Sequence, residues 1–381
     1  MSKKTYIGVG GVAHKVKKGY IGVDGVARRI KKAYIGIGGV ARPCWGEGKI
    51  ERYGLVTYLS AGRRHAAATS MNGYAVFAGG IGYDTATSAT AYYNTVSFYD
   101  SKLTVTERAM QKARYAAAAA RVGQHVVIGG GVDASDYYAT VDAFDSSLSR
   151  SVPSNLALAR QYLAATNIGN YALFAGGHAT TTAYVKNTVD AYDTSLTHTN
   201  PTTLYEERSN LAATSIGDYA LFGGGFHNTY LKVVDAYNKS LTRSNPTSFT
   251  HGRRELMATS IEDYAIFAGG YDATSDDDYL STLEVYNKSL THLLPSAISP
   301  LSVGRSQGAA TSVGGFAIFG GGTPITDVVD VFDKALTRTI PSALYYGRSQ
   351  LAGASVGDYA LFAGGGAYGA NLTYVDAYVV S

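Results

Sequence analysis

The sequence predicts an all-β protein, in which a seven-bladed β-propeller over residues 49–381 follows a short arm of β-hairpins over residues 1–48. Three observations lead to this prediction. The composition, with 45 Gly and 31 Tyr but only 16% charged residues, is rich in turn formers and β-favouring aromatics. A strand-and-glycine motif recurs seven times in the larger part of the chain. A shorter motif recurs three times before it, and repeats of fixed period determine the architecture of such a protein.

The long repeat is marked by an apolar strand that ends in paired glycines. An arginine stands eleven residues before each copy, and a run rich in Ala, Ser and Thr follows that arginine. Small residues suit the innermost strand of a propeller blade, where the strands crowd around one axis. Each copy therefore predicts strands a and b of one blade. The copies are Tyr74–Gly80, His125–Gly131, Tyr171–Gly177, Tyr219–Gly225, Tyr264–Gly270, Phe316–Gly322 and Tyr359–Gly365.

Two further strands are expected in each blade. A third strand is visible in Val189–Asp193, Val234–Asn238 and Val329–Asp333, and a Ser-Leu-Thr segment after it begins an outer strand. The seventh copy ends at Ser381 with three strands, whereas residues 49–53 precede Arg63 at the distance of an outer strand. We therefore expect residues 49–53 to complete the last blade, which removes two free sheet edges.

These features resemble the kelch family of repeat proteins. The match consists of the paired glycines, the aromatic residue of strand c and the arginine that opens strand a, over residues 49–381. The chain departs from the family in lacking a tryptophan in strand d, because its single tryptophan, Trp45, lies before the repeats. The resemblance implies a β-propeller.

The N-terminal arm is a second, basic module. Three 14-residue units occupy residues 3–16, 17–30 and 31–44, and each predicts a hairpin with its turn at Gly10-Gly11, Asp24-Gly25 or Gly38-Gly39. Residues 1–50 hold 11 Lys and Arg against 2 acids, whereas residues 51–381 hold 22 against 27. Hairpins this small are not stable alone. We therefore expect them to stack on each other, on sister chains in a homo-oligomer, or on a partner.

The arm resembles a short module at the front of accessory structural proteins in phages and prophages of Gram-positive bacteria. This resemblance implies that the arm docks onto a virion or tail structural protein and that the propeller is displayed outward. It also implies a location in the virion, after assembly in the bacterial cytoplasm. Clustered Lys and Arg also fit a nucleic-acid-binding segment. Against this, the charges repeat in phase with the hairpins, as expected of solvated strand ends without a partner.

The first candidate site is the set of arginines that open strand a. Connections in an up-and-down meander alternate between faces, so these arginines are expected at the channel mouth beside the b-to-c loops. Guanidiniums gathered there would bind a carboxylate, a sulfate or an acidic sugar. The structural alternative is that each arginine pairs with an acid in strand c, which six blades carry. The arginines are Arg63, Arg114, Arg160, Arg208, Arg253, Arg305 and Arg348, and the acids are Asp142, Asp190, Asp235, Glu284, Asp330 and Asp376.

The second candidate site is the group of b-to-c loops, where the copies differ most. Variable loops on a rigid repeat favour a glycan-binding or protein-binding surface, and Tyr offers stacking area and a hydroxyl with few rotors to freeze. The alternative is polar loop composition without a ligand. The candidate residues are Tyr83, Tyr92, Tyr137, Tyr138, His227, Tyr230 and Tyr279.

Metal and catalytic chemistry find little support in the sequence. Cys44 is the single cysteine, which excludes a multi-cysteine metal site. Asp276, Asp277 and Asp278 lack the spacing of an EF-hand loop, and the eight His lack a metal-binding spacing. No nucleophile elbow, P-loop or dinucleotide fingerprint is present. We therefore expect no metal, no cofactor and no catalytic residue.

The leading hypothesis is a non-enzymatic phage or prophage virion accessory protein, whose arm docks to the particle and whose propeller binds a host-surface glycan or protein. The first alternative is an intracellular bacterial kelch-like scaffold for protein–protein interaction. The second is a glycan-active enzyme, in which Arg, Tyr and Asp of the loop face would hydrolyse a glycoside. Neither a secretion signal nor membrane insertion is expected, because no apolar run has the length that either requires.

Overall fold

The chain divides into two compact units, Met1–Glu51 with Val380–Ser381, and Arg52–Val379. The computed structural model describes the backbone of residues 6–9, 12–15, 20–23, 26–29, 32–37 and 40–46, and it describes residues 48–381 except 85, 180–183 and 294. Over these residues the regular structure is strands, together with one 3-10 turn, η1 (Pro295–Ala297). The predicted all-β class is therefore confirmed.

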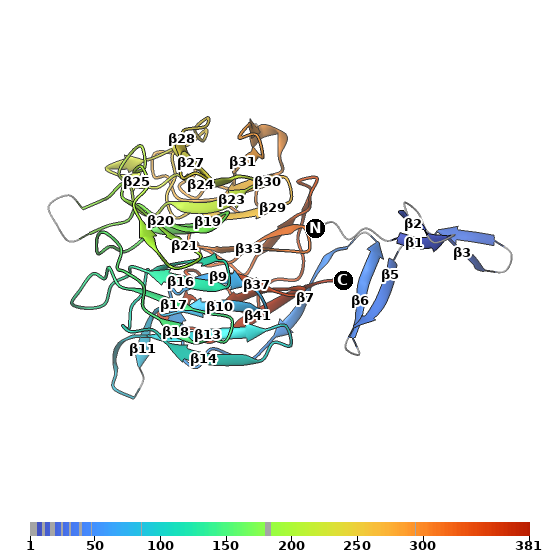
Figure 1. The fold of residues 1–381 in the computed structure, drawn as a ribbon, viewed down its shortest axis with the longest axis horizontal. Coiled ribbons are helices and arrows are strands. Elements are labelled where there is room, and N and C mark those ends of the chain that lie inside the picture. Colours follow the sequence, from blue (N-terminus) through green and yellow to red (C-terminus); the bar gives the residue numbers. More distant parts are fainter. Residues whose placement is uncertain are drawn as a thin grey trace. The chain divides into compact units, whose positions relative to one another are not determined.

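Four-stranded antiparallel sheets dominate the described part of the chain, and there are seven of them (Figure 1). The first strands are β9 (Ala67–Met71), β15 (Ala118–Val122), β19 (Ala164–Ile168), β23 (Ala212–Ile216), β29 (Met257–Ile261), β33 (Ala309–Val313) and β37 (Ala352–Val356). The second strands are β10 (Tyr74–Ala78), β16 (His125–Gly129), β20 (Tyr171–Ala175), β24 (Tyr219–Gly223), β30 (Tyr264–Ala268), β34 (Phe316–Gly320) and β38 (Tyr359–Ala363). The first strands contain the run rich in Ala, Ser and Thr, and the second strands contain the apolar run that precedes the paired glycines.

The outer half of the sheets varies more in length: the fourth strand has two residues in the five middle sheets, but five in the first sheet and six in the last. The third strands are β13 (Thr95–Asp100), β17 (Val141–Phe144), β21 (Val189–Asp193), β27 (Val234–Asn238), β31 (Leu283–Asn287), β35 (Val329–Phe332) and β41 (Val375–Val380). The fourth strands are β14 (Val105–Ala109), β18 (Arg150–Ser151), β22 (His198–Thr199), β28 (Arg243–Ser244), β32 (His292–Leu293), β36 (Arg338–Thr339) and β7 (Ile50–Leu55). In the last sheet the strand order is β37-β38-β41-β7, so a segment from before the repeats supplies the fourth strand.

Smaller strand pairs lie in the loops and in the arm. In the loops, β8 (Arg63–Arg64) and β12 (Ala89–Tyr92) flank β11 (Ile81–Asp84), β25 (Phe226–His227) pairs with β26 (Thr229–Tyr230), and β39 (Gly366–Ala367) pairs with β40 (Ala370–Asn371). In the arm, β1 (Tyr6–Val9) pairs with β2 (Val12–Lys15), β3 (Tyr20–Val23) with β4 (Val26–Arg29), and β5 (Lys32–Ile37) with β6 (Val40–Gly46). The expected turns at Gly10-Gly11, Asp24-Gly25 and Gly38-Gly39 lie outside the described residues.

Burial explains why the first and second strands differ in sequence. On β23 every other residue is buried, namely Ala212, Thr214 and Ile216, as expected of a strand with one packed face. On β24 the four residues after Tyr219 are all buried, because this strand is covered on both faces. A continuous apolar run is the pattern of such a strand. The small residues of the first strand and the large residues of the second therefore reflect two different environments.

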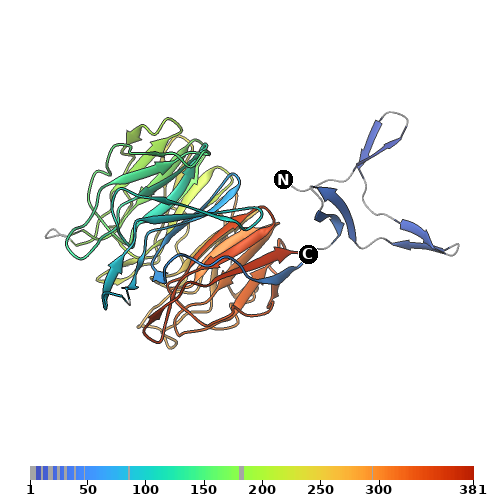
Figure 2. The same ribbon diagram turned by 90° about the horizontal axis from the view of Figure 1, so that it is seen from below.

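Consecutive sheets contact each other through their first strands, and β37 of the last sheet contacts β9 of the first. Backbone hydrogen bonds follow the same order: the second glycine after each second strand donates its N–H to the carbonyl of the arginine that precedes the next sheet. For example, Gly177 donates to Arg208 at 2.9 Å, and Gly365 donates to Arg63 at 2.9 Å. The blue and red strands of the first and last sheets accordingly lie side by side (Figure 2).

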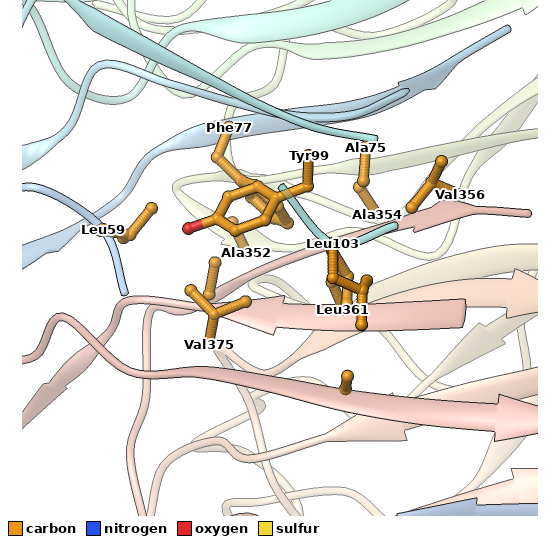
Figure 3. Close-up of a cluster of buried hydrophobic side chains, with 12 residues drawn as sticks. Leu59, Ala75, Phe77, Tyr99, Leu103, Ala352, Ala354, Val356, Leu361 and Val375 are labelled. Atoms are coloured by element: carbon orange, nitrogen blue, oxygen red, sulfur yellow. The ribbon is translucent and has the colours of Figure 1, made fainter. Parts of the chain in front are cut away.

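A buried apolar cluster joins the last sheet to the first (Figure 3). Phe77 and Tyr99 of the first sheet lie against Leu361 and Val375 of the last. The Tyr99 hydroxyl donates a hydrogen bond to the Thr57 carbonyl at 2.8 Å. Burial of each large apolar side chain stabilises the fold by about 1.5–3 kcal/mol. The chain ends of this unit are thus held together by packing as well as by strand pairing.

The paired glycines are required by close backbone approach. Gly224 has φ +67°, and a Cβ there would lie 2.7 Å from the Arg253 carbonyl oxygen. Gly225 has φ +110°, and a Cβ there would lie 2.9 Å from the Ser209 carbonyl oxygen. Any other residue at these two positions would destabilise the fold, because its Cβ would be strained by the left-handed backbone and would clash with the carbonyl oxygen. The paired glycines therefore allow neighbouring sheets to pack closely together.

Candidate binding site

The arginines that open strand a are fully buried, which corrects the expectation of guanidiniums exposed at a channel mouth. Arg63, Arg114, Arg160, Arg208, Arg253, Arg305 and Arg348 each have 0% exposure. Six of them form ion pairs with the acids of strand c, which are also fully buried. The pairs are Arg114–Asp142, Arg160–Asp190, Arg208–Asp235, Arg253–Glu284, Arg305–Asp330 and Arg348–Asp376. This geometry is the structural alternative stated above, and it leaves these arginines no surface for a ligand.

Each buried pair also fixes backbone groups. Arg208 donates from Nη2 to Asp235 Oδ2 at 2.6 Å and to the Phe222 carbonyl at 3.2 Å. Its Nη1 donates to the Glu206 carbonyl at 3.1 Å. Asp235 Oδ1 in turn accepts the Tyr205 backbone N–H at 2.9 Å. The pair therefore ties the linker before Arg208 to the second and third strands of its own sheet.

The first sheet lacks the acid, and a longer connection replaces it. Ser97 takes the position of the acid and accepts a hydrogen bond from Arg63 Nη2 at 2.8 Å. The Ser97 hydroxyl donates to Glu107 Oε1 at 3.2 Å. Burial lowers the pKa of Arg63, and the nearby Glu107 opposes this shift. The charge that balances Arg63 thus comes from β14, the longest of the fourth strands after β7.

The residue two positions after each arginine, and not the arginine, faces a common opening. These residues have φ between 51° and 56°, and the backbone N–H of each donates to the carbonyl of its counterpart in the preceding sheet, at 2.7–3.2 Å. The bonds run from sheet to sheet and return to the starting residue. We call this set the hydrogen-bonded ring: His65, Ala116, Tyr162, Asn210, Glu255, Gln307 and Gln350.

A cavity of about 410 Å³, the ring pocket, is lined by all residues of the hydrogen-bonded ring. Because the ring backbone groups bond to each other, side chains determine what the pocket can bind. Gln350 Nε2 donates to Gln307 Oε1 at 3.0 Å, and Gln307 Nε2 donates to Glu255 Oε2 at 2.8 Å. On the other side, the His65 ring packs on Tyr162, with centroids 5.9 Å apart. The pocket therefore has an amide and carboxylate side and an aromatic side.

Burial shifts the pKa values of the aromatic side. It lowers the pKa of His65 to about 4, and the neighbouring Arg64 contributes in the same direction. Burial also raises the pKa of Tyr162 to about 12. Both side chains are therefore uncharged near neutral pH, so Glu255 carries the only formal charge among the ring residues.

A larger cavity of about 570 Å³, the seam pocket, lies beside the ring pocket and shares Tyr162 and Asn210 with it. The seam pocket is lined by two b-to-c loops, which contribute His178, Tyr184 and Val185 from one sheet and Phe226, His227 and Asn228 from the next. Glu207, Ser209 and Gln161 complete the lining. The rings of His178 and Tyr184 are stacked, with centroids 5.6 Å apart.

The structure brings several of the loop residues expected from the sequence into aromatic clusters. The Tyr137 hydroxyl lies 3.1 Å from His178 Nδ1 and accepts a hydrogen bond from Gln161 Nε2 at 3.2 Å. The Tyr230 ring lies 5.8 Å from that of Tyr271. His227 lines the seam pocket. Tyr137 and His227 therefore lie in or beside the seam pocket, and Tyr230 lies in an aromatic cluster with Tyr271.

The remaining loop residues lie further from the pockets. Tyr92 contacts Tyr115, and Tyr279 contacts Tyr271, with centroids 6.0 and 5.3 Å apart. Tyr83 is 51% exposed on β11. Tyr138 donates its hydroxyl to Asp133 Oδ2, and this bond raises the pKa of Tyr138 to about 12.

The residues of the hydrogen-bonded ring and most of those of the seam pocket were not predicted from the sequence. A usable pattern was present for the ring. The position two residues after the constant arginine holds six residue types in seven copies, whereas the surrounding strand is nearly uniform. The seam pocket has no such pattern, because its lining comes from separate segments that only folding brings together.

Within the described residues, no group of three or more His, Cys, Asp and Glu side chains is placed to hold a metal ion. No helix in the described part of the chain has the length and apolar character needed to cross a membrane.

Comparisons with known proteins bear on the fold alone. No family model matches the chain. No curated protein matches it by sequence. One solved structure, described as "Structure of YjhT", is similar with a TM-score of 0.57 and 13% identity, and the match covers 75% of this chain and 99% of that one. At this identity the similarity indicates a shared arrangement of strands and carries no statement about activity.

Proposed function

We propose that the repeats form a kelch-like, seven-bladed β-propeller whose loop face binds a host-surface glycan or protein, without catalysis. The fold part rests on the cyclic order of contacts and hydrogen bonds between consecutive sheets. A propeller built in this way presents one face of variable loops on a uniform framework.

One observation carries the binding function. The framework repeats with little change, whereas the side chains that line the ring pocket and the seam pocket differ from sheet to sheet. Each cavity, of about 410 or 570 Å³, is lined by aromatic rings, amides and one carboxylate. Such a lining is usual for a small-ligand site. Of the two ligand classes, a glycan is favoured over a protein, because sugar rings stack on tyrosine and their hydroxyls form hydrogen bonds with amides.

The basic arm supports placement on a phage or prophage particle. Its hairpins pair internally as β1/β2, β3/β4 and β5/β6, and pairs this short need a larger surface for stability. We propose that this surface is a virion or tail structural protein. Genes for tail or head proteins beside the gene for this chain, and the chain itself in purified particles, are the expected findings.

Cell-surface binding by the full chain is the direct test. Fluorescently labelled protein is incubated with a panel of Gram-positive strains and with their purified surface polysaccharides. Saturable binding to at least one strain, competed by its polysaccharide, is the expected result. Absence of binding to every strain and polysaccharide would overturn the proposal.

A further inference from the structure

The described lining of the seam pocket has the aromatic rings and the carboxylate of a cation-binding site but no Lys or Arg side chain that would fill it. Glu207 lines it without an ion pair among the described residues, and the aromatic lining includes Tyr162, Tyr184 and Phe226. Among the described residues of the lining, none is Lys or Arg. Burial lowers the pKa of His178, which keeps this ring uncharged near neutral pH. Aromatic faces with a carboxylate attract a positive group.

The neighbouring seam shows what such a cluster holds within this molecule. There the Arg254 guanidinium lies over the rings of Phe226, Tyr230 and Tyr271, with its carbon 5.1, 5.7 and 5.3 Å from their centroids. The chain therefore fills this aromatic cluster with its own cation.

Ser209 takes the position of Arg254 in the seam pocket. Ser209 follows Arg208 as Arg254 follows Arg253, and both form the same bridge, Ser209 with Phe226 and Arg254 with Tyr271. Serine is too short to reach the aromatic rings of the preceding loop. The space that the Arg254 guanidinium fills in its own seam is thus part of an open cavity of about 570 Å³ in the preceding seam.

We propose that the seam pocket binds an amine-bearing sugar, whose ammonium group takes the place that the Arg254 guanidinium occupies in the neighbouring seam. The inference rests on the glycan-binding function proposed above and defines its ligand class. Glu207 balances the ammonium charge, Tyr162 and Tyr184 offer faces to the sugar ring, and Asn210 and Asn228 are placed to bond hydroxyls. The cavity is too large for an ammonium ion alone and lies in the range of small-molecule sites. An acidic sugar is excluded by the same carboxylate.

The test measures binding of glucosamine oligosaccharides to the full chain by isothermal titration calorimetry, with the N-acetylated oligosaccharides of equal length as the comparison. We expect the free-amine form to bind at least tenfold more tightly. Glu207→Gln is expected to weaken that binding by about ten- to hundredfold, as for loss of a charge-assisted hydrogen bond. Glu206→Gln is the matched control, because Glu206 does not line the pocket, and it should bind as the unmodified chain does.

Ser209→Arg is the second variant, because it supplies the pocket with a cation from the chain itself. It should abolish binding while its melting temperature stays at or above that of the unmodified chain. If this variant fails to fold, the comparison of Glu207→Gln with Glu206→Gln decides the question.

Two outcomes would overturn the inference. Equal binding of the free-amine and N-acetylated sugars would do so, and so would binding of lysine peptides in preference to amine-bearing sugars. Both leave the proposed surface-binding function in place. Failure of that function is a separate result, namely no binding to any strain or polysaccharide.

Discussion

Replacing Arg208 by alanine tests whether the buried arginines are structural. The substitution removes three hydrogen bonds, to Asp235, Phe222 and Glu206, from a side chain with no exposure. It leaves Asp235 fully buried, with the Tyr205 N–H and the Asn245 amide as donors. Removing one partner of a buried ion pair typically costs about 3–5 kcal/mol. We expect the lower half of this range, because Arg243 Nε lies 3.7 Å from Asp235 Oδ1 and supplies part of the charge.

The expected change in melting temperature follows from the size of the unit. Residues 52–379 have an unfolding entropy of about 0.7 kcal/mol/K, at about 2.1 cal/mol/K per residue. A loss of about 3–4 kcal/mol therefore lowers the melting temperature by about 4–6 °C if the unit unfolds in one transition.

Differential scanning calorimetry of three proteins makes the comparison. The unmodified chain, Arg208→Ala and the control Arg243→Ala are scanned under the same conditions. Arg243 is partly exposed and pairs at a longer distance, so its loss should cost at most about 1 kcal/mol. A melting temperature for Arg208→Ala within about 1 °C of the unmodified chain would refute the structural role. Loss of affinity for an acidic sugar without loss of stability would instead support the ligand-binding role.

Three further substitutions test other parts of the framework. Burial holds the pKa of His65 at about 4, below its ordinary value of 6.5, so between these pH values the unfolded chain binds a proton and the folded chain does not. The free energy of unfolding should therefore fall as the pH falls through this window, by up to about 3 kcal/mol. His65→Asn should lose less free energy of unfolding between pH 7 and pH 5 than the unmodified chain, as measured by urea unfolding; an equal loss in the two proteins would contradict this. Tyr237→Phe should cost about 1 kcal/mol in urea unfolding, because it removes the 2.7 Å bond to the Thr202 carbonyl, and no change would show that this bond contributes nothing. Asn238→Ala should cost about 1–2 kcal/mol by the same measurement, since its Oδ1 accepts two backbone N–H groups, at 2.9 and 3.0 Å; a smaller loss than for Tyr237→Phe would contradict the order expected.

The candidate site was predictable only in part. Tyr137, Tyr230 and His227 were named from the variable loops, and the structure places them in or beside aromatic clusters. Their role in binding a ligand stays a prediction. The arginines were wrongly expected at a ligand site. A residue that is the same in every copy belongs to the buried framework, whereas a residue that varies at a fixed position lies at the surface. Glu207 and Ser209 gave no local pattern, since their role depends on loops from two sheets.

The sequence by itself determined the all-β class, the positions of the first, second and third strands and the sites of the paired glycines. It could do so because alternation of burial, turn chemistry and the repeat period are local properties of the chain. The tertiary structure alone decided that each arginine is buried against an acid, that the residue two positions later faces the ring pocket, and that Ser209 leaves a space which Arg254 fills in the next seam. These facts depend on distances between segments far apart in the chain, and only the packing of neighbouring sheets sets those distances.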